Sequence, residues 1–361
     1  MDGARNRGFV LVLVLAMLVI LALLAGTVAA VSQRLRDQEL DRKRLEDAEI
    51  DLASTKATLL YLLLTQRMTF GGLTVDERMV LTEDEQVMQG DSDRPISLFP
   101  VGNEISLDGR AYAGLGSTAF ALQDDRGLLG VNWTLPQFME RWWAQLEYIA
   151  TPAPTLANLL LDYQDEDDLY RLNSAERREY LREGRSPPLN LPLATPLELR
   201  LVKGWDKALA GLDDDRLLRT LTVARMPAIN VNTAPVEVLR VLPGIDEGTA
   251  NRIVAKRALG PFTHLSAFHA FIGGVVAEED RLSLYPSDSG TMRLWAPLGG
   301  GVHTVHWTLT PWDDGGRPWR EDYGLTLPQD PDDSVQALAR PAAPLLAKPL
   351  LPPGRRAAPP Q

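Results

Sequence analysis

An acidic block near the middle of the chain holds the side chains best suited to binding chemistry. It reads Asp162-Tyr163-Gln164-Asp165-Glu166-Asp167-Asp168, and Glu176 follows soon after it. Hard cations prefer several oxygen ligands, and carboxylates two or three residues apart on a turn can converge on one ion. The spacing is not that of an EF-hand. Candidate cation ligands are therefore Asp162, Asp165 and Asp167; the alternative is a solvated acidic loop before a helix that Asn173 or Ser174 caps.

The other polar residues do not form a recognisable catalytic set. The histidines are His264, His269, His303 and His306, and the last two are three residues apart, so in a strand they would point to opposite faces. The sequence has neither a glycine-rich phosphate loop nor a nucleophile elbow. Nothing marks the cleft that a glycosidase carboxylate pair requires. We expect this protein not to be an enzyme.

A compact helical hairpin is predicted between residues 229 and 262. Thr233 can cap a first helix over 234–242, Pro243-Gly244-Ile245 forms a turn, and Asp246 can cap a second helix over 246–258. The segment resembles the helix-hairpin-helix DNA-binding module, whose turn is usually Gly-Ile-Gly. Here Asp246 replaces the second glycine, and its charge would repel a phosphate. Basic and acidic residues nearly balance from 229 to 274, so we expect a packing role and no nucleic-acid binding.

The N-terminus combines a short basic leader with a long apolar segment. Residues 9–33 carry no charge, and as a helix they would span roughly 37 Å, enough for a bilayer. Gly8 followed by Phe9 resembles the cleavage site of type IV prepilins, which implies removal of residues 1–8 and retention of the apolar helix. No proline interrupts the chain before Gly71, so we expect one helix over residues 9–66, with 9–33 spanning the membrane.

Bulk composition narrows the functional class. The chain has 361 residues, a net charge of −11 and no cysteine. The negative charge argues against a general nucleic-acid or anionic-membrane surface. The absence of cysteine excludes disulfides and thiolate chemistry and leaves the compartment open. Arginines and lysines also follow the apolar segment, so the positive-inside rule does not fix the orientation by counting.

Four ordered pieces resemble the K-type (GspK) minor pseudopilins of type II secretion systems. Most pilin-like proteins carry Glu at the fifth mature position; here Leu13 stands there, and the lack of this Glu is characteristic of the K type. The acidic block with Tyr163 and Ser174, the Pro192–Trp205 block and the Asn230-x-Asn232-Thr-Ala opening also resemble segments of this family. A further partial match lies at Asp124-Asp125 after a predicted strand, where we expect a hairpin over 117–132.

The resemblance implies an α+β pilin-like fold with a large inserted all-α domain of the sterile-alpha-motif-like or helix-hairpin-helix kind. The long N-terminal transmembrane helix would pack on a small antiparallel sheet. The expected parts are a leader (1–8), the N-terminal helix (9–66), a first α/β part (67–134), the helical insertion (135–285), returning strands (286–329) and a disordered Pro-rich tail (330–361).

The resemblance also implies a role at the tip of the type II secretion pseudopilus, in protein export across the outer membrane. Partners would be the I-type and J-type minor pseudopilins, a prepilin peptidase and the inner-membrane secretion platform. The protein would cross the inner membrane once, with a cytoplasmic N-terminus and its bulk in the periplasm. Known members bind calcium, which makes Ca²⁺ the expected cofactor. The alternatives are a minor pilin of a type IV pilus or DNA-uptake machine, and a membrane-anchored helix-hairpin-helix DNA receptor.

Overall fold

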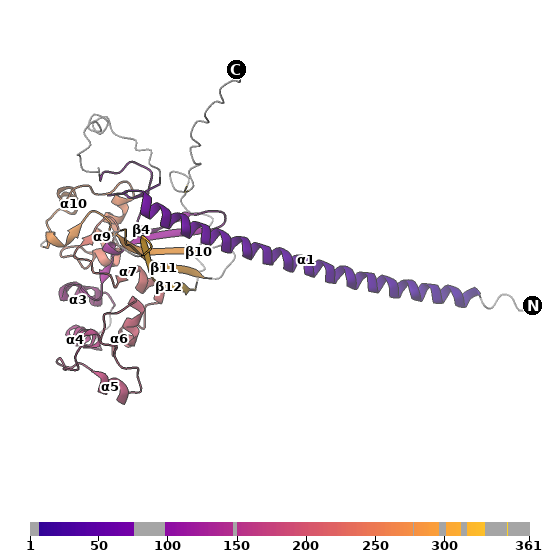
Figure 1. The fold of residues 1–361 in the computed structure, drawn as a ribbon, viewed down its shortest axis with the longest axis horizontal. Helices are drawn as coiled ribbons and strands as arrows, with labels where there is room; N and C mark the ends of the chain where they lie inside the picture. The colour runs from indigo at the N-terminus through magenta and orange to yellow at the C-terminus, as the bar shows by residue number, and fades with distance from the viewer. Residues whose placement is uncertain are drawn as a thin grey trace, which may run out of the picture. The chain divides into compact units, whose positions relative to one another are not determined.

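The computed structural model describes residues 7–75, 98–146, 150–276, 278–295, 301–311 and 316–328, together with Leu345 (Figure 1). The chain divides into two compact units, Met1–Asp51 and Leu52–Gln361. Most of the expected leader and of the expected Pro-rich tail lies outside the described residues. Leu345 is the described residue of the tail, and it is buried in the hydrophobic core of the second unit.

The first unit consists of the greater part of one helix. Helix α1 runs from Arg7 to Thr65, so it includes Gly8 and Phe9 and ends one residue before the predicted end. Helix boundaries scatter by one or two residues, so the bounds agree with the predicted 9–66. An apolar window near its N-terminus has a mean hydropathy of 3.0 and none of it is buried. Leu13 is exposed, and α1 has the length and composition of a membrane-spanning helix.

The second unit is built around an antiparallel sheet with the strand order β12-β11-β10-β5-β4. One face of this sheet packs against the last turns of α1. Leu59 and Leu63 share a hydrophobic core with Phe120, Leu122 and Trp307 of the sheet. The strands are β4 (Asp108–Ala113), β5 (Ala119–Asp124), β10 (Ser289–Trp295), β11 (Val302–Leu309) and β12 (Trp319–Leu327).

A long, mostly helical segment leaves the sheet after β5 and returns at β10. These two strands pair directly, with Phe120 opposite Leu294, so the helical segment is an insertion between two neighbouring strands. The predicted α+β architecture is therefore confirmed. The helices are α3 (Pro136–Ala144), α4 (Ala153–Gln164), α5 (Arg177–Arg182), α6 (Trp205–Ala208), α7 (Asp214–Thr220), α8 (Val236–Leu239), α9 (Glu247–Arg257) and α10 (Leu265–Ile272), with 3₁₀ turns at Asp125–Gly127, Pro196–Leu201 and Glu279–Arg281.

The insertion has its own hydrophobic core, centred on large aromatic side chains. Trp143 and Trp205 lie edge to face with ring centroids 4.9 Å apart, and both indoles are buried with leucines from the surrounding helices. Such contacts add to the free energy gained from apolar burial. The insertion also contains short strands, so it is not purely helical: β7 (Leu221–Thr222) pairs with β6 (Leu129–Gly130), and β8 (Ile229–Asn230) pairs with β9 (Leu282–Ser283).

The expected hairpin over residues 117–132 is wrong. Strand β5 pairs with β4 and β10, whereas the following strand β6 pairs in parallel with β7. The reason lies at Asp124 and Asp125, whose buried side chains take hydrogen bonds from the insertion. The 3₁₀ turn that begins at Asp125 directs the chain away from the sheet.

A small second sheet lies next to the C-terminal end of α1. It has the order β1-β2-β3, formed by Met68–Thr69, Gly72–Thr74 and Glu104–Ile105. Gly72 has φ of +129°, and a Cβ built there would lie 2.1 Å from the carbonyl oxygen of Ile105. A side chain at this position would therefore separate β2 from β3.

Candidate functional site

Three carboxylates converge where α4 ends and α5 begins. Asp162 lies in the last turn of α4, Asp165 follows its last residue, and Glu176 precedes the first residue of α5. One oxygen from each lies within 4.8 Å of the others. The C-terminal end of α4 carries the negative end of the helix dipole, so it disfavours the two aspartates and favours a cation beside them.

Glu176 is the least satisfied member of this group. Its residue is only 1% exposed, and neither carboxylate oxygen has a hydrogen-bond donor among the described residues. Burial and the charges of Asp162 and Asp165 raise the pKa of Glu176 to about 7. A buried, unpaired carboxylate is costly unless a cation or a proton neutralises it.

Asp162 is held as an anion by its neighbours. Burial would raise its pKa, but hydrogen bonds from Ser174 and from Arg171 together lower it below the usual range. The backbone N–H of Arg171 donates to Asp162 Oδ2 at 2.9 Å. The Arg171 guanidinium contacts both Asp162 and Asp165, and the Ser174 hydroxyl also donates to Asp162.

The donor set fits a hard divalent cation. Ligand oxygens on opposite sides of Ca²⁺ are up to roughly 5 Å apart, because each Ca–O distance is about 2.3–2.6 Å, and the carboxylates converge within that span. Of the predicted ligands, Asp162 and Asp165 belong to this group, whereas Asp167 accepts a hydrogen bond from Leu169 N at 2.8 Å and does not join it. Glu176 also belongs to this group and is not among the predicted ligands, although it follows the acidic block closely in the sequence.

The helix-hairpin-helix segment is packed into the core of the insertion. Pro243, Gly244 and Ile245 form the turn between α8 and α9, where Gly244 has φ of +78° and Ile245 is buried. Helix α8 is shorter than the predicted 234–242, since the chain turns after Arg240 to approach Pro243. Asp246 accepts from Thr249 N at 2.7 Å and so caps α9.

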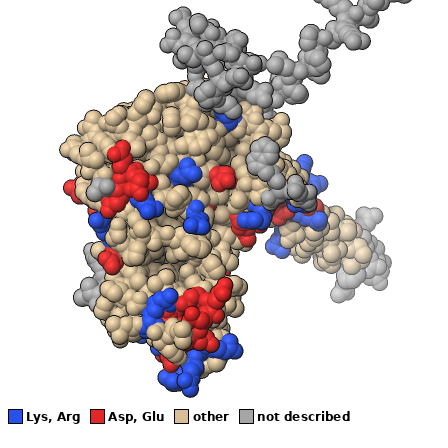
Figure 2. Space-filling view, turned by 60° about the vertical axis from the view of Figure 1, so that its left-hand side comes forward, with Lys and Arg blue, Asp and Glu red and all other residues tan. Residues whose placement is uncertain are grey.

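The basic side chains of this segment are largely committed to internal contacts. Arg257 is buried, and its Nη1 donates to the carbonyl oxygens of Val231 and Ala234. Burial lowers the pKa of Arg257 to about 10, although Asp108 acts in the opposite direction. Arg240 forms an ion pair with Glu247 at 3.6 Å. On the face drawn in Figure 2, the described Lys and Arg side chains are interspersed with Asp and Glu and do not form a continuous basic stripe.

A buried polar network joins the sheet to the insertion. Asp124, at the end of β5, accepts hydrogen bonds from Asn230, Thr233 and Ser287. Burial raises the pKa of Asp124 above its ordinary value, although these hydrogen bonds act in the opposite direction. Two of the motifs in the sequence, the Asp124-Asp125 pair and the Asn230-to-Ala234 segment, therefore meet in space and serve a structural role.

Asp125 extends this network to the outer strands. His306 on β11 lies between two carboxylates, with Nε2 2.8 Å from Asp125 Oδ2 and Nδ1 2.8 Å from Asp322 Oδ2. Thr222 of the insertion also donates to Asp125, at 3.0 Å. Burial would lower the pKa of His306, but the two carboxylates raise it to about 9. His303 instead contacts Thr326, so the two histidines do not form a metal pair.

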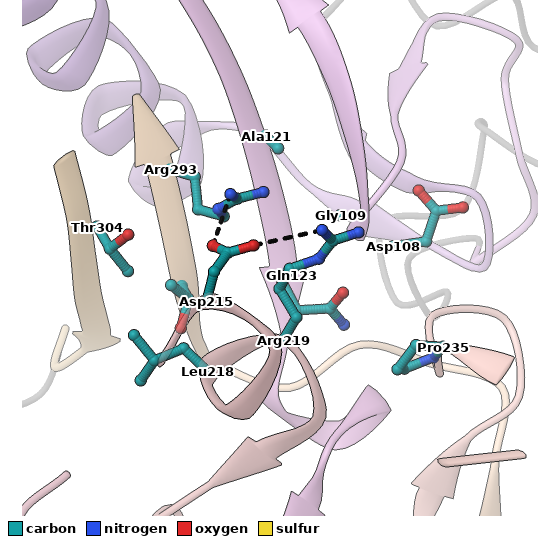
Figure 3. Close-up of a pocket in the computed structure, with 11 residues that line it drawn as sticks. Asp108, Gly109, Ala121, Gln123, Asp215, Leu218, Arg219, Pro235, Arg293 and Thr304 are labelled. Carbon is teal, nitrogen blue, oxygen red and sulfur yellow. Dashed lines mark hydrogen bonds and ion pairs between the residues drawn. The ribbon is translucent and has the colours of Figure 1, made fainter. Parts of the chain in front are cut away.

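A small cavity lies between the sheet and α7, lined by residues of both (Figure 3). Asp215 of α7 lies between Arg293 of β10, 2.6 Å away, and Arg219, 3.3 Å away. The cavity volume is about 50 Å³, whereas sites for small-molecule substrates usually have a volume of roughly 300–1,000 Å³. This cavity has room for water and is too small for an organic substrate.

Comparison with known proteins identifies one motif. Residues 226–273 match the family model of the helix-hairpin-helix motif. No curated protein matches the sequence. Among solved structures, a chain of the GspK-GspI-GspJ complex from the enterotoxigenic Escherichia coli Type 2 Secretion System is similar with a TM-score of 0.46 and 17% sequence identity; the match covers 81% of this chain and 99% of that chain.

Proposed function

We propose that this chain is a K-type minor pseudopilin of a type II secretion system. It acts at the pseudopilus tip with the I-type and J-type minor pseudopilins and supports protein export across the outer membrane. Helix α1 crosses the inner membrane once, with the N-terminus in the cytoplasm and the second unit in the periplasm. The secretion platform receives the subunit after a prepilin peptidase removes residues 1–8. We propose no catalytic role for the chain.

The observation that carries this proposal is the continuity of α1. A single helix contains the Gly8–Phe9 junction, the uncharged segment and the apolar turns that pack on an antiparallel sheet. A plain membrane anchor does not require that the membrane-spanning segment and the helix packed on the sheet form one unbroken helix. Leu13 provides no carboxylate for a neighbouring N-terminal amine, which suits a subunit with no neighbour above it. The insertion between β5 and β10 adds bulk that favours the tip over the filament interior.

Processing by a prepilin peptidase tests the proposal directly. The full chain is co-expressed with the peptidase, and the N-terminus of the product is read by mass spectrometry. We expect a mature species that begins at an N-methylated Phe9. Gly8→Leu should block cleavage, and Gly26→Leu serves as a matched control, because a Cβ at Gly26 meets no other atom within 4 Å. An uncut wild-type chain beside a processed control pseudopilin would refute the proposal.

We also infer that Asp162, Asp165 and Glu176 bind Ca²⁺. The unsatisfied, buried oxygens of Glu176 support this assignment, because a divalent cation would neutralise them and the two aspartates together. Calorimetric titration of the EDTA-treated chain with CaCl₂ tests it, with Glu176→Gln as the variant and Glu183→Gln as the control. Glu183 is exposed and pairs with Lys203 outside the group. Equal calcium binding by both variants would exclude Glu176 as a ligand.

The helix-hairpin-helix match favours a membrane-anchored DNA receptor as the second candidate function. Binding of phosphates by this module would require accessible cations and backbone amides near the turn. Arg257 is instead buried and Asp246 caps α9. We expect no salt-dependent binding of duplex DNA in a fluorescence-anisotropy titration. Binding that weakens steeply with salt and is lost on mutation of the turn would make the receptor the better candidate.

A further inference from the structure

Arg171 occupies the side of the carboxylate group that faces solvent. It lies in the loop between α4 and α5, and its Nη1 donates to both Asp162 and Asp165. The side chain is 40% exposed, whereas that of Asp162 is fully buried. The guanidinium therefore reaches into the group from its open side and can leave toward water.

The contacts of Arg171 cover only part of the group. The guanidinium contacts Asp162 and Asp165, and both oxygens of Glu176 remain without a donor among the described residues. One guanidinium supplies one positive charge to three carboxylates. A divalent cation supplies two and can bind oxygens from all three, so it satisfies what Arg171 leaves unsatisfied.

We propose that Arg171 is a built-in counter-cation that competes with the divalent cation for Asp162 and Asp165. The proposal rests on the inferred cation site and goes beyond it. Without the ion, the guanidinium reduces repulsion between the two aspartates and holds the loop against α4. When the ion binds, the side chain moves into solvent and Glu176 joins Asp162 and Asp165 around the ion.

The backbone geometry allows this exchange without unfolding of the loop. The backbone N–H of Arg171 donates to Asp162 Oδ2, and Asn158 of α4 donates to the carbonyl oxygen of Leu172 at 2.9 Å. These contacts fix the loop on α4 independently of the guanidinium. Departure of the Arg171 side chain therefore frees ligand oxygens while the loop stays in place. Arg171 sets the threshold of calcium at which the site is filled.

Calcium titration of full-length variants tests the competition. The detergent-solubilised chain is stripped with EDTA and titrated with CaCl₂ by calorimetry, as wild type, Arg171→Ala and Arg182→Ala. Arg182 is the matched control, because it lies on α5, is 72% exposed and pairs with Glu179 outside the group. We expect Arg171→Ala to lower the calcium Kd about tenfold, because calcium would no longer have to displace the guanidinium. The loss of one hydrogen bond between charged groups corresponds to a change in Kd of about this size. Arg182→Ala should change the calcium Kd by less than about twofold, because surface ion pairs contribute little free energy.

Thermal unfolding in EDTA provides the second readout. Arg171→Ala should unfold at a lower temperature than wild type in EDTA, and calcium should raise its unfolding temperature by more than it raises that of wild type. Arg171→Gln removes the charge, keeps much of the side chain, and gives the same test if the alanine variant does not fold. An unchanged or raised calcium Kd in both Arg171 variants would overturn the competition alone. No calcium binding by any variant would overturn the cation site as well, whereas the pseudopilin assignment is tested separately by N-terminal processing.

Discussion

His306 should make the stability of the second unit depend on pH. The residue is 3% exposed. Its imidazole lies between Asp125 and Asp322, at 2.8 Å from each, and stacks on Tyr323. Thr308 and Ser289 donate to these same carboxylates. The folded protein therefore favours the imidazolium, since a neutral ring would leave buried carboxylates with weaker partners.

The magnitude follows from the difference between the folded and unfolded pKa. The pKa of His306 rises from the model-compound value of 6.5 to about 9 in the folded protein. Each pH unit between these values corresponds to about 1.4 kcal/mol, so the total is about 3 kcal/mol. The folded state holds the proton that the unfolded state releases above pH 6.5. This contribution is therefore fully present below pH 6.5 and is lost as the pH rises through about 9.

Urea unfolding of the full chain in detergent, followed by tryptophan fluorescence, measures this dependence. We compare the free energy of unfolding at pH 6 and pH 10 for wild type, His306→Gln and His303→Gln. His303 lies near the start of the same strand, β11, and contacts Thr326, so His303→Gln is the matched control. Wild type and His303→Gln should lose about 3 kcal/mol more than His306→Gln over this range. Equal losses in all three proteins would refute the assignment of a charged His306 in this network.

Three further predictions concern other parts of the second unit. Glu176→Gln should raise the unfolding temperature in EDTA, because the amide needs no counter-charge, and should abolish the increase in unfolding temperature that calcium causes. A variant that calcium still stabilises would argue against Glu176 as a ligand. Leu345→Ala should lower the free energy of unfolding by about 2–5 kcal/mol in urea, because Leu345 is buried with Leu59 and Trp307. An effect below about 0.5 kcal/mol, the usual limit for surface substitutions, would mean that Leu345 contributes no core packing. Asn232→Ala should lower the free energy of unfolding by at least about 1–3 kcal/mol, because the amide of Asn232 donates to the carbonyl oxygens of Phe262 and Leu284 and accepts from Phe262 N. A variant with the stability of wild type would show that water replaces the amide.

The sequence predicted the elements whose signals are local. An unbroken apolar and then amphipathic pattern marked α1 to within two residues of each end. Pro243 and Asp246 marked the turn and the start of α9, because helix-ending and capping residues act on their immediate neighbours. The predicted cap at Thr233 is wrong: Pro235 is the N-cap residue of α8, and the Thr233 hydroxyl donates to Asp124 instead. The strands returning after residue 286 were also foreseen, and β10, β11 and β12 lie there.

Pairings between distant residues could not be read from the sequence. The hairpin over 117–132 fitted the local pattern, yet Asp124 and Asp125 bind residues more than ninety positions away. His306 was weighed as a partner of His303, because these two are neighbours in the chain. His306 instead contacts Asp322 and Asp125, and Asp125 is 181 positions distant in the sequence. Local patterns decide which elements form, and long-range polar contacts decide which of them pair.

The proposed cation site shows that sequence patterns are also limited at shorter range. Four acidic residues follow one another from Asp165, and their spacing led to Asp165 and Asp167 as candidate ligands together with Asp162. Convergence depends instead on where α4 stops and α5 starts, because those two ends bring Asp162 and Asp165 beside Glu176. Asp167 lies between them in sequence and uses its carboxylate to hold its own turn. In such a loop the helix ends decide which carboxylates converge. The residue that precedes the second helix, Glu176, is therefore a better candidate ligand than the next acidic residue in the sequence.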